Sequence, residues 1–390
     1  MSSHDQIDKQ MNAYVTNHEI AGASLLIRNE KGVLYQNKWG YANLEQAVPI
    51  DYDTIFRLAS LTKPIIAVAV LVLVEQGKIQ LEDEIGKFIP ELNELMVCKT
   101  AFSLESLNDL SRVNLTNIKL EPAIRNVTIR DLLTHSSGLG MGVAGHLLAM
   151  KLSEPGDTLE SRFRKFNAYP ADFEPGEGTG YSGIVGFDAL ARAIEVASGI
   201  SLERFLRQYL FEPLEMEDTA FHLSEAQKKR LVVLYKSENG EIFEAPASEG
   251  IDAMVISGPR YCSGAGGLYS TLNDYDRFAQ MLLNEGEYKG VRILNAETVS
   301  KIHREGAYKK LAFAPGLAWG LGMMVRQDPV LAHSSLTAGS YGWSGAFGTH
   351  FFIDPVHKIQ AVLMVNRSNI GGAGSYVSKR VEDLVAETFL

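Results

Sequence analysis

The stretch Phe56-Arg57-Leu58-Ala59-Ser60-Leu61-Thr62-Lys63-Pro64 leads directly into Ile65 to Val74, where every residue is apolar. A helix that is apolar on all sides is a helix buried inside a protein. Proline is tolerated only in the first turn of a helix, where its missing N–H costs least, so Pro64 marks the start. Gly77 supplies a stop signal. The pattern predicts a buried helix over residues 61–76 that begins beside Ser60.

Ser60 and Lys63 are three residues apart and therefore lie on one face of this helix. A serine hydroxyl is a poor nucleophile until a base takes its proton. Burial makes a lysine easier to deprotonate, and a neutral lysine can act as that base. The helix N-terminus adds free N–H groups and a positive dipole end. We therefore predict Ser60 as the nucleophile and Lys63 as its activating partner.

Two other interpretations of this pair are less consistent with the sequence. An N-cap serine followed by a solvated lysine would give the same two residues, but the apolar run that follows argues against a surface helix. A serine nucleophile in a Gly-x-Ser-x-Gly elbow would indicate a different hydrolase fold, and no serine of this chain lies in that pattern.

Composition narrows the class of protein and its partners. The chain has 390 residues, 46% hydrophobic and 22% charged, as in an ordinary soluble enzyme. A net charge of −10 disfavours nucleic acid and anionic membranes as partners. The polar N-terminus has no apolar signal core, so we expect a cytoplasmic protein. The histidines and the two cysteines, Cys98 and Cys262, show no metal or redox spacing, so we expect free thiols and neither metal nor cofactor.

Strand patterns flank a helical middle section. Turn residues between two apolar segments predict a hairpin of residues 22–28 and 32–39, after an N-terminal helix. Three further strands and a closing helix are predicted at 319–325, 346–353, 360–366 and 377–390. Segment 98–126 gives no clear indication. This order predicts an α+β fold rather than alternating β-α-β units.

The same patterns divide the chain into two domains. We expect an antiparallel sheet built from both chain ends, 1–77 and 256–390, with helices flanking it. The insertion 78–255 is expected to be mainly helical. Clefts form at domain interfaces, so the active site is predicted at the junction.

Several motifs, taken together, resemble those of one enzyme superfamily. The first of them is the Ser60 segment. It is followed by Thr128 to Leu139, and then by Phe173-Glu174-Pro175-Gly176 with Tyr181-Ser182. The last three are Pro213-Leu214-Glu215-Met216, Gly264-Ala265-Gly266-Gly267-Leu268 and Trp343-Ser344-Gly345. In this order they resemble the serine β-lactamase and penicillin-binding-protein superfamily, on the branch of class C enzymes, D-stereospecific peptidases and family VIII carboxylesterases. The resemblance covers residues 20 to 365 and implies that superfamily's fold.

The resemblance also implies roles for individual residues. Tyr181 would carry a proton between Ser60 and the leaving group, although a core aromatic is the alternative interpretation. The backbone N–H groups of Ser60 and Ala346 would form the oxyanion hole. Gly345 would let its strand approach the substrate closely, and Ser344 would line the cleft.

Two departures from the superfamily pattern bear on the substrate. The second motif of relatives is Tyr-x-Asn, but here Gly183 replaces the asparagine, so no amide is offered to a peptide-like arm. The third motif normally begins with Lys or His, whereas Trp343 brings an apolar wall and one N–H donor. A neutral, partly apolar substrate is implied. Trp-x-Gly at this position is similar to family VIII esterases and a related acyltransferase group.

Four functions follow, in order of preference. The first is a carboxylesterase for small neutral esters, and the second is an acyltransferase that uses the same acyl-enzyme. A β-lactamase or D-peptidase comes third, and a non-catalytic binding module comes last, because Ser60, Lys63 and Tyr181 are all present. A triad of His135 with Ser60 is disfavoured against a core histidine. Ser136 and Ser137 are interpreted as turn hydroxyls, and the oligomeric state stays open.

Overall fold

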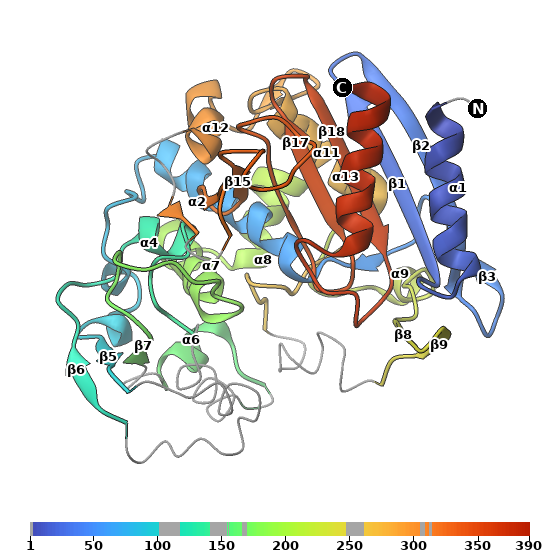
Figure 1. The fold of residues 1–390 in the computed structure, drawn as a ribbon. Coiled ribbons are helices and arrows are strands. Elements are labelled where there is room, and N and C mark those ends of the chain that lie inside the picture. The colour runs from blue at the N-terminus through green and yellow to red at the C-terminus, as the bar shows by residue number, and fades with distance from the viewer. Residues whose placement is uncertain are drawn as a thin grey trace.

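A computed structural model describes residues 3–100, 118–140, 154, 156–165, 170–246, 261–304, 309–311 and 314–390. In these residues the main element is a nine-stranded antiparallel sheet (Figure 1). Its strands, from one edge to the other, are β13 (Lys309–Lys310), β14 (Leu317–Trp319), β15 (Met324–Arg326), β16 (Tyr341–Ser344), β17 (His350–Asp354), β18 (Ile359–Val365), β1 (Gly22–Asn29), β2 (Gly32–Asn43) and β3 (Val48–Pro49). The pairing of β18 with β1 joins the two chain ends, as the sequence predicted.

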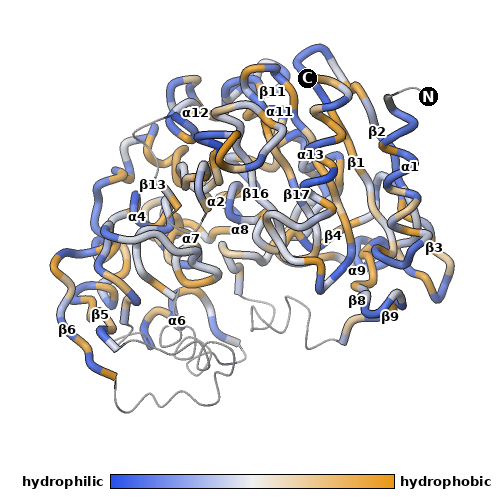
Figure 2. The backbone as a smooth tube through the Cα atoms, in the orientation of Figure 1, coloured by the Kyte–Doolittle hydropathy of each residue, from blue (hydrophilic) through white to orange (hydrophobic). Residues whose placement is uncertain are grey.

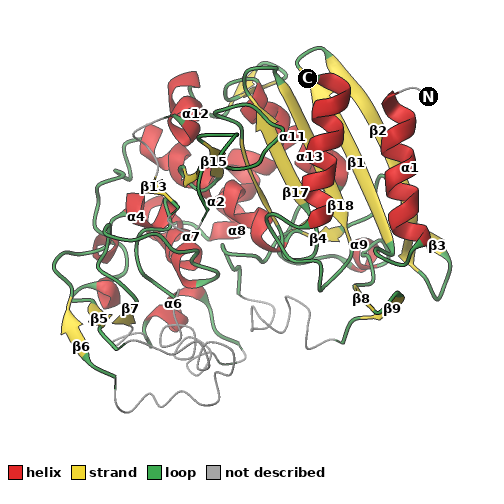
Figure 3. Ribbon diagram, in the orientation of Figure 1, coloured by secondary structure: helices red, strands yellow, loops and turns green. Residues whose placement is uncertain are grey.

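Helices cover both faces of this sheet. On one face α1 (Ser3–Thr16) and α13 (Tyr376–Phe389) lie side by side in front of the strands (Figure 3). On the other face α11 (Leu272–Leu283) packs on β18, β17 and β1. In Figure 2 hydrophobic and hydrophilic residues alternate along α1 and α13, as expected of helices with one face on a sheet. The α+β prediction is therefore confirmed.

The predicted central helix is α2 (Thr62–Glu75), preceded by the 3₁₀-helix η1 (Ala59–Leu61) that carries Ser60. Every α2 residue from Thr62 to Leu73 is buried. The chain leaves the helix at Gly77, whose φ of +70° favours glycine. Burial on all sides explains why the sequence of this helix lacks a polar face.

The middle of the chain contains mostly short helices. They are the 3₁₀-helices η2 (Ile85–Lys87) and η3 (Pro90–Leu92), the α-helices α4 (Ile129–Leu133), α6 (Leu159–Phe163), α7 (Val185–Ser198), α8 (Leu202–Leu206) and α9 (Glu225–Lys228), and the π-helix η6 (Arg207–Phe211); α12 (Ala296–His303) follows later. Among them α7 packs on α2, which attaches this part of the chain to the buried helix.

Short strands interrupt the helical section, and the sequence did not predict them. They are β5 (Met96–Cys98), β6 (Leu120–Pro122), β7 (Pro170–Ala171), β8 (Tyr235–Glu238) and β9 (Glu241–Glu244). Outside this section, two further pairs of short strands are β4 (Phe56–Arg57) with β10 (Tyr269–Ser270) and β11 (Glu287–Tyr288) with β12 (Val291–Arg292). Two of them, β5 and β6, fall in segment 98–126 or at its edge, of which residues 101–117 lie outside the described part.

The segment around β8 makes backbone contacts with the sheet part of the chain. Val233 N–H donates to Ala42 O at 2.8 Å and Tyr235 N–H donates to Asn366 O at 3.0 Å. These bonds tie the segment around β8 to the sheet part, below which it lies in Figure 1. We propose that the inserted part ends before this segment rather than at 255.

Two of the predicted strands have different bounds. Segment 319–325 forms no single strand, because Gly320 and Gly322 make a turn between β14 and β15; Gly322 has φ of +83°. Segment 346–353 is a strand only from His350, because the chain turns first through Gly348, with φ of +92°. In both places glycines allow a turn where the apolar pattern suggested a continuous strand.

Candidate active site

The structure brings together the three residues predicted to be catalytic. Lys63 Nζ lies 3.2 Å from Ser60 Oγ. The Tyr181 hydroxyl donates to Ser60 Oγ at 2.6 Å, although the two residues are 121 positions apart in the chain. Ser60 thus contacts a lysine one turn along its own helix and a phenol from the loop before α7.

Lys63 is completely buried and its ammonium group is fully bonded. Besides Ser60 Oγ, Nζ donates to Gly183 O at 2.8 Å and to Ala265 O at 2.7 Å. These three acceptors match the three N–H donors of an ammonium group. Gly183 therefore serves the site through its carbonyl oxygen.

A buried carboxylate positions one of these carbonyl groups. The Ala265 N–H donates to Asp188 Oδ1 at 3.2 Å. Asp188 also accepts from Ser263 Oγ at 2.7 Å and from Tyr261 Oη at 2.5 Å. Burial, reinforced by this carboxylate, raises the pKa of Tyr261 well above its usual value. The sequence contained no signal for Asp188, because its partners come from a distant segment.

Aromatic rings hold Tyr181 in place. Trp319 lies parallel to it, with ring centroids 5.8 Å apart and 17° between planes. Trp343 donates its indole N–H to Tyr181 Oη at 3.3 Å. That bond gives Trp343 a polar role beside the phenol in addition to the apolar wall that the sequence predicted.

His135 belongs to the same cluster of rings, but it forms no hydrogen bond with Ser60 Oγ. Its Nδ1 accepts the backbone N–H of Ser182 at 3.0 Å, and its ring lies 4.9 Å from that of Tyr181. Burial, and secondly the charge of Lys63, hold the pKa of His135 well below its usual value. A neutral imidazole that packs and binds backbone agrees with the core-histidine interpretation.

The neighbouring polar residues are also structural. Asp131 closes a capping box with Thr128 at the start of α4. Ser136 Oγ donates to Asp131 Oδ1 at 3.2 Å, and Ser137 Oγ accepts from Leu139 N at 3.2 Å. Both hydroxyls serve turns, as the sequence analysis suggested.

The backbone groups predicted for the oxyanion hole lie on two adjoining turns. Ser60 is in the first turn of a helix, where N–H groups lack intrahelical acceptors. Among the described residues nothing accepts a hydrogen bond from the Ala346 N–H. The two turns touch at Gly345, where a Cβ would lie 2.2 Å from Leu58 O. Gly345 therefore allows the end of β16 to approach the chain before Ser60.

Ser60 and Tyr181 open onto a pocket of about 460 Å³. Its other walls are mostly apolar and come from the sheet edge and the loop before α13: Leu311, Ala314, Leu317, Trp319, Met324, Trp343, Ser344, Ala346, Gly372, Ala373 and Gly374. Trp343, Ser344 and Ala346 were predicted at this site. The remaining wall residues were missed, because no local pattern marks a residue whose only role is to face a distant serine.

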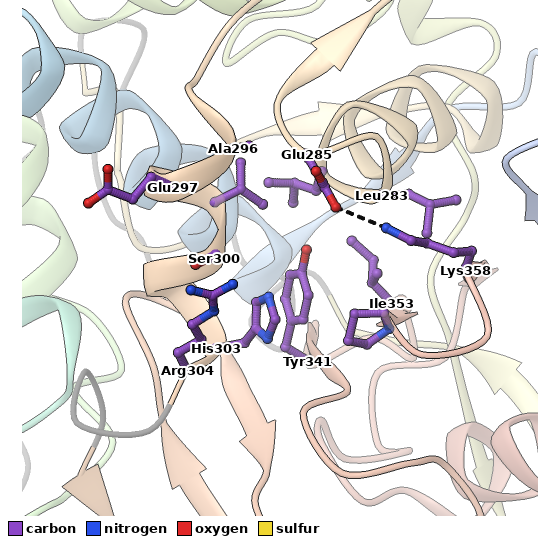
Figure 4. Close-up of a pocket in the computed structure, with 13 residues that line it drawn as sticks. Leu283, Glu285, Ala296, Glu297, Ser300, His303, Arg304, Tyr341, Ile353 and Lys358 are labelled. Carbon is purple, nitrogen blue, oxygen red and sulfur yellow. Dashed lines mark hydrogen bonds and ion pairs between the residues drawn. The ribbon is translucent and has the colours of Figure 1, made fainter.

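A second pocket of about 450 Å³ lies between α11, α12 and β16, away from Ser60 (Figure 4). His303 stacks on Tyr341 there, with centroids 4.7 Å apart and 4° between planes. Glu285 and Lys358 form an ion pair at 3.0 Å above them. Burial, with help from Arg304 and Lys358, lowers the pKa of His303 to about 4. This pocket holds no paired nucleophile and base among its lining residues.

The described part of the chain offers little for other kinds of site. No group of three or more His, Cys, Asp or Glu side chains there could hold a metal ion. Cys98 and Cys262 are both free thiols. None of the described helices is both long and apolar enough to cross a membrane.

A serine at a buried helix start, a lysine one turn later and a tyrosine over the serine, beside an antiparallel sheet, form the arrangement expected of a serine hydrolase of the superfamily that the motifs resemble. Residues 7–384 match the family model described as Beta-lactamase. The chain belongs to the beta-lactamase family, which confirms the superfamily and the fold expected from the motifs.

Individual relatives are similar over nearly their whole length. Esterase EstB of Burkholderia gladioli is 28% identical over 393 residues, which cover 95% of this chain and 92% of EstB. EstCE1, a hydrolase with promiscuous acyltransferase activity, superposes with a TM-score of 0.80 at 23% identity over 98% of both chains. Simvastatin synthase LovD of Aspergillus terreus superposes with a TM-score of 0.80 at 20% identity, over 100% of this chain and 99% of LovD.

Proposed function

We propose that the protein is a carboxylesterase that acts on small neutral esters through an acyl-enzyme on Ser60. One observation carries the proposal: Ser60 Oγ is bonded to both Tyr181 and Lys63 and faces an apolar pocket. The similarity to EstB, which is named an esterase, supports it.

In the first half-reaction Ser60 Oγ bonds to the ester carbonyl carbon. As Tyr181 gives its own proton to the departing alcohol, Tyr181 Oη takes up the Ser60 proton across the 2.6 Å contact, so the phenol ends the step protonated as it began. Lys63 stabilises the negative charge that develops on these oxygens. The sequence analysis gave Lys63 the role of base; its three bonded acceptors favour Tyr181 as the immediate proton carrier.

The carbonyl oxygen becomes negative in the tetrahedral intermediate. The N–H groups of Ser60 and Ala346 are the donors proposed for it, because they adjoin the pocket and the Ala346 N–H is left without an acceptor in the described residues. Donors held in this way typically contribute about 3 to 4 kcal/mol to the barrier.

The pocket walls favour a neutral acyl group. The indole of Trp343 occupies the position where many relatives carry a cationic residue, and no amide side chain stands at Gly183. Arg326, which neighbours the pocket, is engaged by Glu382. A carboxylate on the substrate would therefore lose its hydration at this wall without gaining a free cationic side chain as a partner, which makes its binding unfavourable.

An acyltransferase is the second candidate. The apolar pocket suits an acyl-enzyme that waits for an alcohol, since apolar walls hold less water near the ester carbonyl. The fold that the chain shares with EstCE1 and LovD, whose names describe acyl transfer or synthesis, favours keeping this candidate.

The test is a panel of p-nitrophenyl esters with straight acyl chains of increasing length. We expect kcat/KM to rise about fourfold per methylene, the value of about 0.8 kcal/mol for each buried CH₂, until the pocket is filled. Addition of alcohols measures the share of acyl groups transferred rather than hydrolysed. Hydrolysis of nitrocefin faster than of every ester would overturn the proposal in favour of a β-lactamase.

A Gly183→Asn variant tests why the substrate is expected to be an ester. Among the described residues nothing lies within 4 Å of the position of a Cβ at Gly183, so a side chain fits. One new amide hydrogen bond is worth about 1 kcal/mol, so nitrocefin turnover should rise about fivefold relative to p-nitrophenyl butyrate. Gly183→Ala is the matched control and should leave this ratio unchanged. An unchanged ratio in Gly183→Asn as well would contradict the role given to this position.

A further inference from the structure

A chain of buried polar side chains runs from the pocket into the sheet behind Ser344. Ser344 Oγ is 2.7 Å from His350 Nδ1, and His350 Nε2 is 3.0 Å from Glu382 Oε1. Arg326 pairs with the same carboxylate from the neighbouring strand. The exposed fractions of Ser344, His350 and Glu382 are 3%, 5% and 6%, so all three side chains are buried. Of the three, Ser344 alone lines the substrate pocket.

The charges along this chain set its direction. Burial works against ionisation of Glu382, but Arg326 and His350 outweigh it and bring the pKa of this carboxyl to about 2. Glu382 is therefore an anion, and it meets His350 Nε2 at an ion-pair distance rather than in an aligned hydrogen bond. Its negative charge favours the tautomer that carries the proton on Nε2. The Nδ1 atom is then an acceptor, and the Ser344 hydroxyl donates to it. Ser344 consequently presents oxygen lone pairs, and no proton, to the pocket.

The surroundings of His350 contain few other charges. Phe352 is an apolar neighbour, with ring centroids 6.0 Å apart. A side pocket of about 110 Å³ adjoins the substrate pocket at Ser344, and its lining includes His333 and Lys379, both exposed, together with Arg326 and Glu382. Glu382 is thus the only anion in the lining of this side pocket, among the described residues.

We propose that Ser344, His350 and Glu382 form a proton relay that accepts the proton of the acyl acceptor, an alcohol or water, in the second half-reaction. The proposal rests on the proposed function, because it requires the Ser60 acyl-enzyme. It gives the second substrate a stated chemistry: a hydroxyl donor that binds at Ser344.

The bonds and protons of this step balance. The acceptor oxygen bonds to the acyl carbon, its proton moves to Ser344 Oγ, and the Ser344 proton moves to His350 Nδ1. The bond between the acyl carbon and Ser60 Oγ breaks, and Tyr181 protonates that oxygen. His350 is left as an imidazolium against the Glu382 carboxylate and later returns its proton through Ser344 to solvent, from which Tyr181 is reprotonated.

Two separate groups therefore serve the two oxygens of the second half-reaction. Tyr181 is bonded to Ser60, the oxygen that leaves, whereas Ser344 lines the pocket beside it. If Tyr181 alone served both oxygens, it would have to exchange a proton with the acceptor and with Ser60 Oγ through one hydroxyl group. With the relay, bond formation and bond breaking need not wait for each other.

The test compares acylation with deacylation in a His350→Asn variant. The asparagine oxygen can still accept from Ser344 at the position of Nδ1, but it cannot take up a proton. With p-nitrophenyl butyrate we expect the rate of the initial burst to stay within about twofold of wild type. The steady-state rate should fall on the order of 10²-fold. Acyl-enzyme should accumulate on Ser60 and be visible by intact-mass spectrometry.

Two further variants keep the test decisive. Ser344→Ala leaves His350 in place and should also slow deacylation more than acylation. His303→Asn is the control: it removes a half-buried histidine that packs on β16, at Tyr341, and should leave both rates unchanged. Equal losses in burst and steady state, or no loss in either, would overturn the relay. Failure of intact-mass spectrometry to find an acyl adduct on Ser60 in any of these variants would instead overturn the acyl-enzyme itself.

Discussion

Replacement of Ser60 by alanine is expected to lower kcat for p-nitrophenyl butyrate on the order of 10⁴-fold or more. The hydroxyl is the only atom of the site bonded to both Tyr181 and Lys63, so its loss removes the acyl-enzyme route altogether. Residual turnover would come from water held near the oxyanion donors. Steady-state kinetics measure the loss, and a fluorophosphonate probe followed by peptide mass spectrometry identifies the labelled residue.

Ser24 offers a matched control for this experiment. It is a completely buried serine on β1, and its hydroxyl has no hydrogen-bond partner among the described residues. Ser24→Ala should therefore preserve both activity and probe labelling. Labelling that persists in Ser60→Ala, above all at Ser344, would show that a different serine is the nucleophile and would refute the central assignment.

Removal of the Tyr181 hydroxyl in a Tyr181→Phe variant is expected to lower kcat on the order of 10³-fold. The phenylalanine ring would keep its place against Trp319 and Trp343, so the pocket should retain its shape. The proton of Ser60 would lose its nearest carrier. The burst phase should slow together with the steady state, since this residue serves acylation as well as deacylation.

Tyr35→Phe serves as the control for Tyr181→Phe. Tyr35 is a buried tyrosine whose hydroxyl donates to Asp8 at 2.7 Å, but it lies on the α1 side of the sheet. Its variant should lose about 1 kcal/mol of unfolding free energy, measured by urea denaturation, and no activity. If Tyr181→Phe keeps wild-type kcat, the proton must travel from Ser60 to Lys63 directly, as the sequence analysis first supposed.

Several features of the fold could be predicted because they are local. An unbroken apolar run of this length between Pro64 and Gly77 favours a buried helix, and the structure places α2 there. Period-two patterns separated by turn residues predicted the β1–β2 hairpin. Where glycines broke the pattern, at Gly322 and Gly348, the predicted strands were wrong in extent, because a positive φ depends on the backbone and leaves no trace in the apolar pattern.

Part of the site was also accessible from sequence. The offset of Ser60 and Lys63 is set by helix geometry alone, so their proximity needed no tertiary structure. Tyr181, Trp343 and Ala346 were reached through the resemblance to a family. Their distances could not be derived, and neither could the bond from Trp343 to Tyr181, which joins residues 162 positions apart.

The serine–lysine pair and its buried helix are thus properties of the sequence, because hydrogen bonding and side-chain direction within one helical turn repeat in every helix. The substrate pocket and the support behind it are decided by tertiary structure. Asp188 holds Ala265 for Lys63, and His350 with Glu382 holds Ser344, through contacts between segments with no shared local pattern. Such contacts arise only when the sheet closes and burial forces each polar group to find a partner.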